Sequence, residues 1–282
     1  MKEKTLIEQL AFEMQLRNYS PRTIKTYGSL MSKLEKVSSI SLDKITLTQF
    51  KSFLHELITS ISGTSVSTIN QHISAFKILQ VDVLKREWEQ FKIKRPRREK
   101  KLPVVLSLEE IERIICVTAN LKHKAILMLA YSSGMRRQEI QRMQPSAIDS
   151  SRMQVHVVQG KGKKDRYTIL SVKALESLRD YYKLERPLKF LFEPLGKKGR
   201  PMADQTLTHI VKNNARKAGI KKHISFHTLR HSFATHLLEQ GVNLRLIQEF
   251  MGHVSLKTTA VYLHLVRVDA SSVVSPLDSM SI

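Results

Sequence analysis

Apolar residues recur at helical spacing through the first ninety residues, separated by short breaks of small and polar residues. The first helix is expected at roughly residues 6–17. The second begins at Ser20-Pro21, where a capping residue precedes a proline at the first helical position. Further helical segments lie at 43–58 and 67–84, and the apolar stretch 88–93 closes the unit. The pattern predicts a small bundle of about four helices.

Helical patterning continues in the second half, where strand-like alternation interrupts it once. Ser107 and Glu110 form a capping box that predicts the start of a helix, and the apolar run 125–130 predicts a buried one. Residues 153–170 alternate like two strands joined by a Gly-rich basic turn. Helices are expected again at 173–185 and from 227 onward. We therefore expect two domains that are mainly α with a small antiparallel β-sheet.

Positive charge is the strongest compositional feature of the 282-residue chain, whose net charge is +22. Residues 1–91 contribute only +3, and the remaining residues contribute +19. A charge of this size on a folded chain favours a polyanionic partner. Between the two halves, residues 92–101 hold seven cations, one acid and a proline. This run predicts an extended linker along a nucleic-acid backbone; a solvated tether or a localisation signal is the alternative.

Several classes of protein are disfavoured by composition. No apolar run approaches the roughly 20 residues that a membrane helix needs, and the charged N-terminus lacks the core of a signal peptide. A cytoplasmic protein is therefore expected. The single cysteine, Cys116, excludes an intramolecular disulfide, and we interpret it as a small apolar helix residue. His231 and His236 have no carboxylate or cysteine at metal-ligand spacing, so both are interpreted as ordinary helix residues and no metal site is predicted.

Residues 227–265 contain most of the candidate catalytic residues. His227 and Arg230 lie one helical turn apart, a Gly252-His253 pair follows, and Tyr262 comes nine residues later. Fixed Arg and His donors lower the barrier to attack on a phosphodiester by stabilising its non-bridging oxygens, and a tyrosine can be the covalent nucleophile.

Two further segments supply what the same chemistry needs. Arg136 follows the buried apolar run, with Glu139 three residues on and able to orient it. Lys161 lies between two glycines at the tip of the predicted hairpin, where it can reach a leaving oxygen. Arg137 competes with Arg136 for the first role, and Lys163 and Lys164 compete with Lys161 for the second.

Taken together, these segments resemble the tyrosine recombinase (phage integrase) family, most closely its small Xer-type members. The family pattern is filled in order and at compatible spacing, with specific motifs over roughly residues 103–265 and a weaker likeness in the first ninety residues. The positions that match are Arg136, Lys161, His227, Arg230, His253 and Tyr262. The resemblance implies a site-specific recombinase that cuts and rejoins DNA without metal, ATP or any other cofactor.

The roles that the resemblance implies are specific. Tyr262 attacks the scissile phosphate to give a 3′-phosphotyrosyl link, and Lys161 protonates the departing 5′-oxygen. Arg136 and Arg230 bind the non-bridging oxygens, and His253 hydrogen-bonds the phosphoryl group. His227 assists proton movement on the tyrosine side.

The resemblance also implies an organisation of the chain. A helical core-binding domain (1–91) grips DNA, a basic linker (92–102) follows, and the catalytic domain (103–265) precedes a tail (266–282) that docks on a neighbouring protomer. Candidate DNA contacts beyond the catalytic set are Arg22, Lys25, Tyr27, Thr68, Asn70, His72, Lys94, Arg95, Arg97, Arg98, Lys163, Lys164, Lys212, Arg216, Lys217, Lys221 and Lys222.

The partners implied are double-stranded DNA with inverted-repeat core sites and further copies of the chain. Four protomers act on two duplexes through a Holliday junction, as a homotetramer or together with a paralogous recombinase. Two rival functions stay open. One is a type IB topoisomerase-like enzyme that relaxes a single duplex, and the other is a non-catalytic DNA-binding regulator. Integration, excision, inversion and dimer resolution are all compatible with the sequence.

Overall fold

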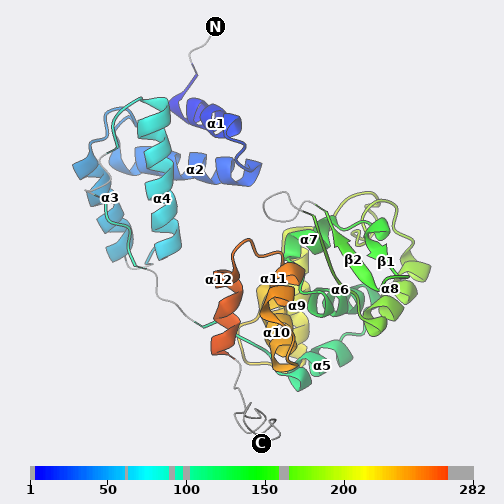
Figure 1. Ribbon diagram of the computed structural model, residues 1–282. Helices are drawn as coiled ribbons and strands as arrows, with labels where there is room; N and C mark the ends of the chain where they lie inside the picture. The colour runs from blue at the N-terminus through cyan, green and yellow to red at the C-terminus, as the bar shows by residue number, and fades with distance from the viewer. Residues whose placement is uncertain (1–3, 61–62, 89–92, 98–101, 159–164, 266–282) are drawn as a thin grey trace, which may run out of the picture. The chain divides into compact units, whose positions relative to one another are not determined.

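The computed structural model of the protein describes residues 4–60, 63–88, 93–97, 102–158 and 165–265. The chain divides into two compact units, Met1–Lys100 and Lys101–Ile282 (Figure 1). Both are helical, and the second also holds a small antiparallel sheet, so the predicted fold class is confirmed. No helix among the described residues combines the length and apolar character that crossing a membrane requires.

The first unit contains the four helices predicted from its periodicity. Each begins where a hydroxyl side chain accepts a hydrogen bond from a backbone N–H of the first turn, and the caps are Thr5, Ser20, Thr46 and Ser65. Phe50, Phe53 and Phe76 form the aromatic part of its core. The helices are α1 (Leu6–Leu16), α2 (Pro21–Ser38), α3 (Leu47–Thr59) and α4 (Val66–Ile78), and α4 continues into a π-helical turn, η1 (Leu79–Val83).

Two residues expected on the DNA-facing surface of this unit lie in its interior, so that expectation was wrong for them. His72 is 1% exposed, and its ring packs edge-on against Phe53 at 5.2 Å between centroids. Asn70 is 8% exposed, donates to the Val66 carbonyl and accepts from Arg95. Both sit on the face of α4 that contributes Ile69 and Ile73 to the core, and polarity alone did not reveal that face.

The buried His72 should make the first unit sensitive to acid. Its Nδ1 has no hydrogen-bond partner among the described residues, and burial, with a smaller effect of Lys33, lowers the pKa of His72 to about 4. The unfolded chain binds a proton near the ordinary pKa of about 6.5. Above pH 6.5, His72 therefore leaves the free energy of unfolding unchanged. As the pH falls from about 6.5 to 4, the free energy of unfolding decreases by at most about 1.4 kcal/mol per pH unit.

We expect His72→Leu to flatten this loss. The chain has one tryptophan, Trp88, and it packs on the core of this unit, so its fluorescence reports unfolding of this unit in the full-length protein. Urea midpoints measured between pH 7 and 4 should fall less steeply in the variant. The exposed His55 on α3 provides the matched control, since His55→Leu should keep the wild-type slope. Equal slopes for the wild type and His72→Leu would contradict the assignment.

The second unit is built around α6 (Leu121–Ser132), which contacts several other helices of the unit. The predicted capping box at Ser107 and Glu110 is present and begins α5. Lys122 at the start of α6 forms a 2.9 Å ion pair with Glu185 at the end of α8. The helices before the C-terminal region are α5 (Leu108–Cys116), α6, α7 (Arg137–Arg142), the 3₁₀ turn η3 (Pro145–Ala147), α8 (Val172–Glu185) and α9 (Asp204–Lys217).

The sheet has three antiparallel strands in the order β1-β2-β3. The strands β2 (Gln154–Val157) and β3 (Arg166–Ile169) pair in the register Gln154 to Ile169, which confirms the predicted hairpin. The short β1 (Ile148–Asp149) was not predicted, because two residues carry no readable alternation. The hairpin brings Arg166, the first residue of β3, close to α11 (Leu244–Met251).

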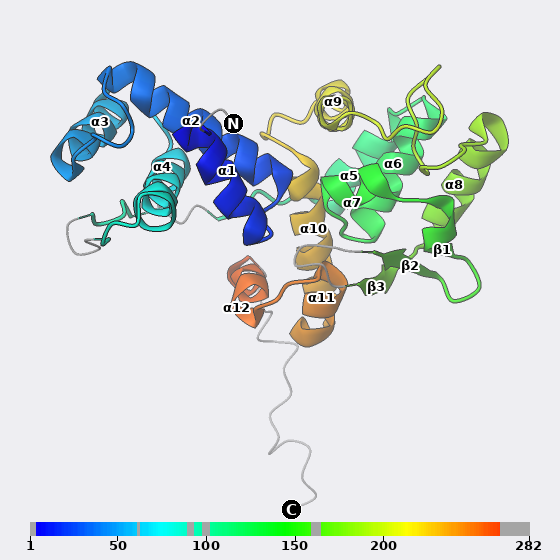
Figure 2. The same ribbon diagram turned by 90° about the horizontal axis from the view of Figure 1, so that it is seen from above.

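The C-terminal helices form a small core of their own, which includes Phe233, Ile247, Met251 and Tyr262. Figures 1 and 2 show α10, α11 and α12 grouped on one side of this unit, and α10 contacts both α6 and α11. The elements are α10 (Phe226–Glu239), α11 (Leu244–Met251), α12 (Leu256–Thr259) and the 3₁₀ turn η4 (Ala260–His264).

Candidate active site at the end of helix α11

Three arginine side chains converge on the C-terminal end of α11. The carbonyls of three successive residues each accept one guanidinium: Phe250 from Arg166, Met251 from Arg230, and Gly252 from Arg136. The last carbonyls of a helix have no partner within the helix and carry its negative dipole, so they attract cations. The end of α11 thus gathers three positive charges from β3, α10 and the start of α7.

Glycines allow the backbone to turn at this point. Gly252 caps α11 with a φ of +58°, and a Cβ there would lie 2.7 Å from Cδ of Arg166. Gly134 also has a φ of +58°, and a Cβ on it would lie 2.3 Å from the ring of Phe233. Only glycine meets both the left-handed backbone and the close approach at these two positions. Gly134 therefore lets the chain turn from α6 into the site directly before Arg136.

Arg136 is fixed by local and distant contacts together. It is the N-cap residue of α7, and its backbone N–H donates to Glu139 Oε2 at 2.7 Å. Its guanidinium donates to Glu139 Oε1 at 2.8 Å and to the Gly252 carbonyl at 3.0 Å. An arginine has five N–H donors, so three remain for another acceptor. The predicted pairing of Arg136 with Glu139 is thus present in the structure.

The neighbouring Arg137 points to a different element. Its guanidinium donates to Asp204 at 2.8 Å and to the Thr208 hydroxyl at 2.9 Å, both on α9. The geometry therefore distinguishes the two adjacent arginines, of which Arg136 joins the cluster at α11.

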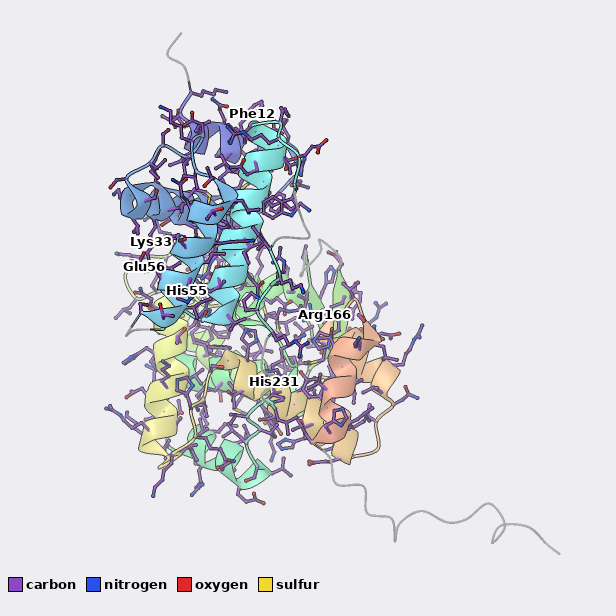
Figure 3. The ribbon with its side chains drawn as sticks, turned by 90° about the vertical axis from the view of Figure 1, so that its left-hand side faces the viewer. Phe12, Lys33, His55, Glu56, Arg166 and His231 are labelled. Atoms are coloured by element: carbon purple, nitrogen blue, oxygen red, sulfur yellow. The ribbon has the colours of Figure 1, made fainter. Side chains whose placement is uncertain are left out.

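Arg166 was not identified from the sequence. Its guanidinium forms a bidentate ion pair with Glu139, at 2.8 and 2.7 Å, and its Nε donates to the Phe250 carbonyl at 2.8 Å. Arg166 is labelled in Figure 3. Burial opposes ionisation of Glu139, but hydrogen bonds and charge from Arg166 and Arg136 outweigh it and lower the pKa of Glu139 to about 2. Glu139 is thus an anion that holds two arginines. Arg166 comes after a basic run, and nothing in that pattern separates it from its neighbours.

Arg230 is the most buried of the cluster, with 3% of its surface exposed. Its guanidinium donates to the Gly134 carbonyl at 2.5 Å and to the Met251 carbonyl. Burial, followed by the charge of Arg136, lowers the pKa of Arg230 to about 9, so the group stays charged at neutral pH. A buried guanidinium with unused donors can bind an anion strongly.

The two predicted histidines lie beside this cluster. His253 directly follows Gly252, and its Nδ1 is 2.9 Å from the Thr259 hydroxyl. Burial, then Arg230 and Arg136, lowers the pKa of His253 to about 3. His227 is exposed at the start of α10, where partial burial, then Arg230, Arg136 and Arg137, lowers its pKa. Both imidazoles are therefore neutral at pH 7 in the absence of an added anion.

Tyr262 is buried on η4, with 3% of its surface exposed. Its hydroxyl is 2.9 Å from Nδ1 of His231 on α10 (His231 is labelled in Figure 3). Burial raises the pKa of Tyr262, and the charges of Arg230 and Arg136 oppose that rise. The tyrosine thus lies within the electrostatic reach of both arginines. His231, interpreted from sequence as an ordinary helix residue, is its hydrogen-bond partner.

Lys161, Lys163 and Lys164 lie outside the described residues, as does Arg98. The strands that flank the lysines are described, and His156 on β2 stacks on Tyr167 of β3 with 4.7 Å between ring centroids. The choice among the three lysines therefore stays a prediction.

The other candidate DNA contacts differ in their surroundings. Arg95 donates to the Asn70 carbonyl and to the Ser74 hydroxyl, so it is held on α4. Lys222 donates to Glu110 at 2.6 Å. Tyr27 and Thr68 are half-buried, and the Tyr27 ring packs on the core of the first unit. Arg95 and Lys222 are exposed, and the other exposed candidates are Arg22 and Lys25 on α2, Lys94 and Arg97 after η1, Lys212, Arg216 and Lys217 on α9, and Lys221 after α9.

This arrangement is suited to binding an anion next to a tyrosine. A cavity of about 520 Å³ adjoins it and is lined by Arg136, Glu139, Arg142 and His156, among others. Among the described residues, no group of three or more His, Cys, Asp and Glu side chains is arranged to hold a metal ion. Among the described residues, the positive charge at the end of α11 is carried by Arg136, Arg166 and Arg230.

Comparison with known proteins identifies the family. Residues 105–267 match the Phage integrase family and residues 6–90 match the phage integrase N-terminal SAM-like domain. The chain is 33% identical over 274 residues to the putative integrase/recombinase y4qK of Sinorhizobium fredii, covering 97% of this chain and 88% of that protein. It is also 33% identical over 279 residues to the tyrosine recombinase XerD of Oceanobacillus iheyensis, covering 93% and 91%.

A solved structure agrees at the level of the fold. The XerH site-specific recombinase bound to its difH substrate in a pre-cleavage complex aligns with a TM-score of 0.71 at 24% identity, covering 90% of this chain and 78% of that one. The family matches and the helical fold with its small sheet thus agree. The chain belongs to the phage integrase family of tyrosine recombinases and is similar to its Xer members.

Proposed function

We propose that this tyrosine recombinase cuts DNA with Tyr262, forming a 3′-phosphotyrosyl link, and rejoins it to a different strand. The gathering of Arg136 and Arg230 at the end of α11, within electrostatic reach of Tyr262, carries the proposal. Both guanidiniums have more N–H donors than the described residues occupy, and such donors stabilise the negative charge that develops on the non-bridging oxygens. His253 then hydrogen-bonds the phosphoryl group.

The covalent link conserves the energy of the phosphodiester bond, so neither ATP nor a metal ion is required in this proposal. Lys161 protonates the departing 5′-oxygen from the hairpin between β2 and β3. His227 assists on the tyrosine side, as the family pattern implies. The exposed cations Arg22, Lys25, Lys94, Arg97, Lys212 and Arg216 are assigned to phosphates along the duplex, where they position the enzyme without reading sequence.

The assembly that we propose is a tetramer on two duplexes with inverted-repeat core sites, working in the cytoplasm on the nucleoid. Domain 1–91 grips the DNA, the linker 92–102 follows its backbone, and the tail 266–282 docks on a neighbour. The mobile-element integrase of Tn1549 has the same fold at 18% identity and a TM-score of 0.73. That likeness is to the fold alone, so mobilisation of an element remains a proposal.

A suicide substrate tests the function directly. Duplex DNA with a nick beside the cleavage point loses a short fragment after cleavage, so religation fails and the covalent complex accumulates. We expect a protein–DNA adduct, and with two intact sites we expect Holliday junctions. Relaxation of a single duplex without junctions would favour the topoisomerase-like alternative. Binding without any adduct would favour the non-catalytic regulator.

The general acid has its own test. A substrate with sulfur in place of the bridging 5′-oxygen expels a thiolate that needs no proton. We expect Lys161→Ala to lose most cleavage on the ordinary substrate and to recover it on the sulfur substrate. Lys163→Ala and Lys164→Ala are the matched controls in the same turn. Recovery by one of them in place of Lys161→Ala would move the role along the turn.

The tail can be separated from catalysis. Residues 271–282 carry one charged side chain, Asp278, and the apolar residues Val273, Val274 and Leu277. Their deletion should leave binding and cleavage at a single site intact while four-protomer complexes and junctions decrease, as gel-shift analysis would show. Normal assembly of the truncated protein would contradict the docking role.

A further inference from the structure

The hydrogen bond between Tyr262 and His231 joins the proposed nucleophile to a base that the family pattern does not include. His231 Nδ1 lies 2.9 Å from the Tyr262 hydroxyl, and the two ring centroids are 5.7 Å apart. His227 lies one helical turn before His231, with 6.3 Å between the ring centroids. Among the described residues, the hydroxyl of Tyr262 forms its hydrogen bond with His231 and not with His227.

We propose that His231 accepts the proton of Tyr262 as the hydroxyl attacks phosphorus. The proposal rests on the proposed function, since it requires that Tyr262 is the nucleophile. The Tyr262 oxygen forms its bond to phosphorus while the bond from phosphorus to the 5′-oxygen breaks. The phenolic proton moves to Nδ1 of His231, and the leaving oxygen takes a proton from the general acid. For Nδ1 to accept, the imidazole hydrogen is on Nε2.

The geometry favours a base here, because the hydrogen-bond partner of a buried hydroxyl is the nearest group to which its proton can move. Tyr262 is 3% exposed, so solvent has little access to its hydroxyl. A phenol at neutral pH is a weak nucleophile until a nearby base removes its proton. A general base must lie within about 2.6–3.2 Å of the donor atom, and His231 meets this requirement.

The charges around His231 make its pKa depend on whether a phosphate is bound. Burial, then His227 and Arg230, lowers the pKa of His231 to about 4, so it is a neutral acceptor before DNA binds. The other groups that face this region are Tyr262 from η4, Arg136 from the start of α7 and His253 after α11. A phosphate at the arginines adds negative charge. It offsets the guanidiniums and raises the pKa of His231 toward the range of an effective base.

The test compares two substitutions of His231. Asparagine places an oxygen near the position of Nδ1, so His231→Asn keeps an acceptor for the Tyr262 hydroxyl without a useful basicity, and His231→Ala removes both. On the nicked substrate at pH 7, both variants should lose roughly 10²- to 10⁴-fold in the rate of adduct formation, the range of general-base catalysis. The loss should persist on the bridging-sulfur substrate, since sulfur relieves only the leaving side.

The pH profile separates a base from a residue that only positions the ring. Without a base, cleavage depends on the tyrosinate fraction of Tyr262, which rises tenfold per pH unit as long as the pH stays below the phenol pKa, and burial raises that pKa. The rates of both variants should therefore approach wild type as the pH rises from 6.5 to 9. His236→Asn is the matched control, because His236 lies on the same helix with Nδ1 2.8 Å from the Tyr131 hydroxyl. It should cleave at the wild-type rate.

Four results would overturn the proposal. A faster rate in His231→Ala would mean that the histidine holds Tyr262 in a resting position. A loss that stays constant with pH would mean a positioning role. A large, pH-dependent loss in His227→Asn with none in His231→Asn would assign the base to His227. In the wild type, ¹⁵N shifts of labelled histidine that place the His231 hydrogen on Nδ1 would exclude acceptance there.

The proposed function and the role of His231 are contradicted by different results. A wild-type protein that forms no adduct on the nicked substrate contradicts the proposed function. An active wild type alongside a His231→Asn variant of equal rate contradicts only the role of His231.

Discussion

Tyr262→Phe should bind its DNA site with nearly wild-type affinity and form no covalent adduct on a nicked substrate. The substitution removes one hydroxyl and keeps the ring in its core with Phe233, Ile247 and Met251. The fold loses a single hydrogen bond, that to His231, which contributes about 0.5–1.5 kcal/mol. The cleavage reaction loses the phenolic oxygen that would bond to phosphorus. Adduct formation on denaturing gels and affinity from gel shifts measure the two effects separately.

Tyr131→Phe is the control, since the Tyr131 hydroxyl also bonds a histidine of α10, His236, at 2.8 Å. It should retain adduct formation. An adduct in the Tyr262→Phe variant would show that another residue is the nucleophile.

The catalytic candidates were readable from sequence because their signals are local. The capping box joins Ser107 to Glu110 and the ion pair joins Arg136 to Glu139, each across a separation of three residues, and both are present. The hairpin at β2 and β3 follows from strand alternation around a Gly-rich turn. Such signals depend on contacts within one turn or one hairpin, which the order of residues determines directly.

The parts that sequence reasoning missed depend on contacts between distant segments. Arg166 meets Glu139 and the Phe250 carbonyl across separations of 27 and 84 residues. His231 meets Tyr262 across 31 residues. No periodicity marks either residue, because each belongs to an element whose neighbours are polar or basic as well. His72 shows the converse error, since a polar side chain on α4 is buried against Phe53.

The contacts at the end of α11 show that Glu139 and the Gly252 carbonyl hold arginine side chains in place. Glu139 bonds Arg136 and Arg166, and successive carbonyls from Phe250 to Gly252 hold the same arginines and Arg230. Each arginine is therefore fixed by acceptors before a phosphate arrives. Donors fixed in advance need little reorganisation as charge develops, which is why such arrangements stabilise transition states effectively.

Arg136→Ala and Arg230→Ala should each lower the rate of cleavage roughly 10²-fold or more, the effect of deleting one fixed transition-state donor. Arg137→Ala is the matched control for Arg136, because Arg137 is its neighbour in the chain yet pairs with Asp204 on α9. It should retain most activity. Rates of adduct formation at saturating DNA measure the chemical step apart from binding.

The two variants should differ in stability. Arg230→Ala leaves the Gly134 and Met251 carbonyls without their donor, and each buried acceptor costs about 1–3 kcal/mol. Arg136 is more exposed, so its loss should perturb the fold less. Urea unfolding curves of each variant therefore accompany the kinetics, and cleavage is compared where both remain folded. A greater loss in Arg137→Ala than in Arg136→Ala would show that the guanidinium paired with Asp204, rather than the one at the end of α11, meets the phosphate.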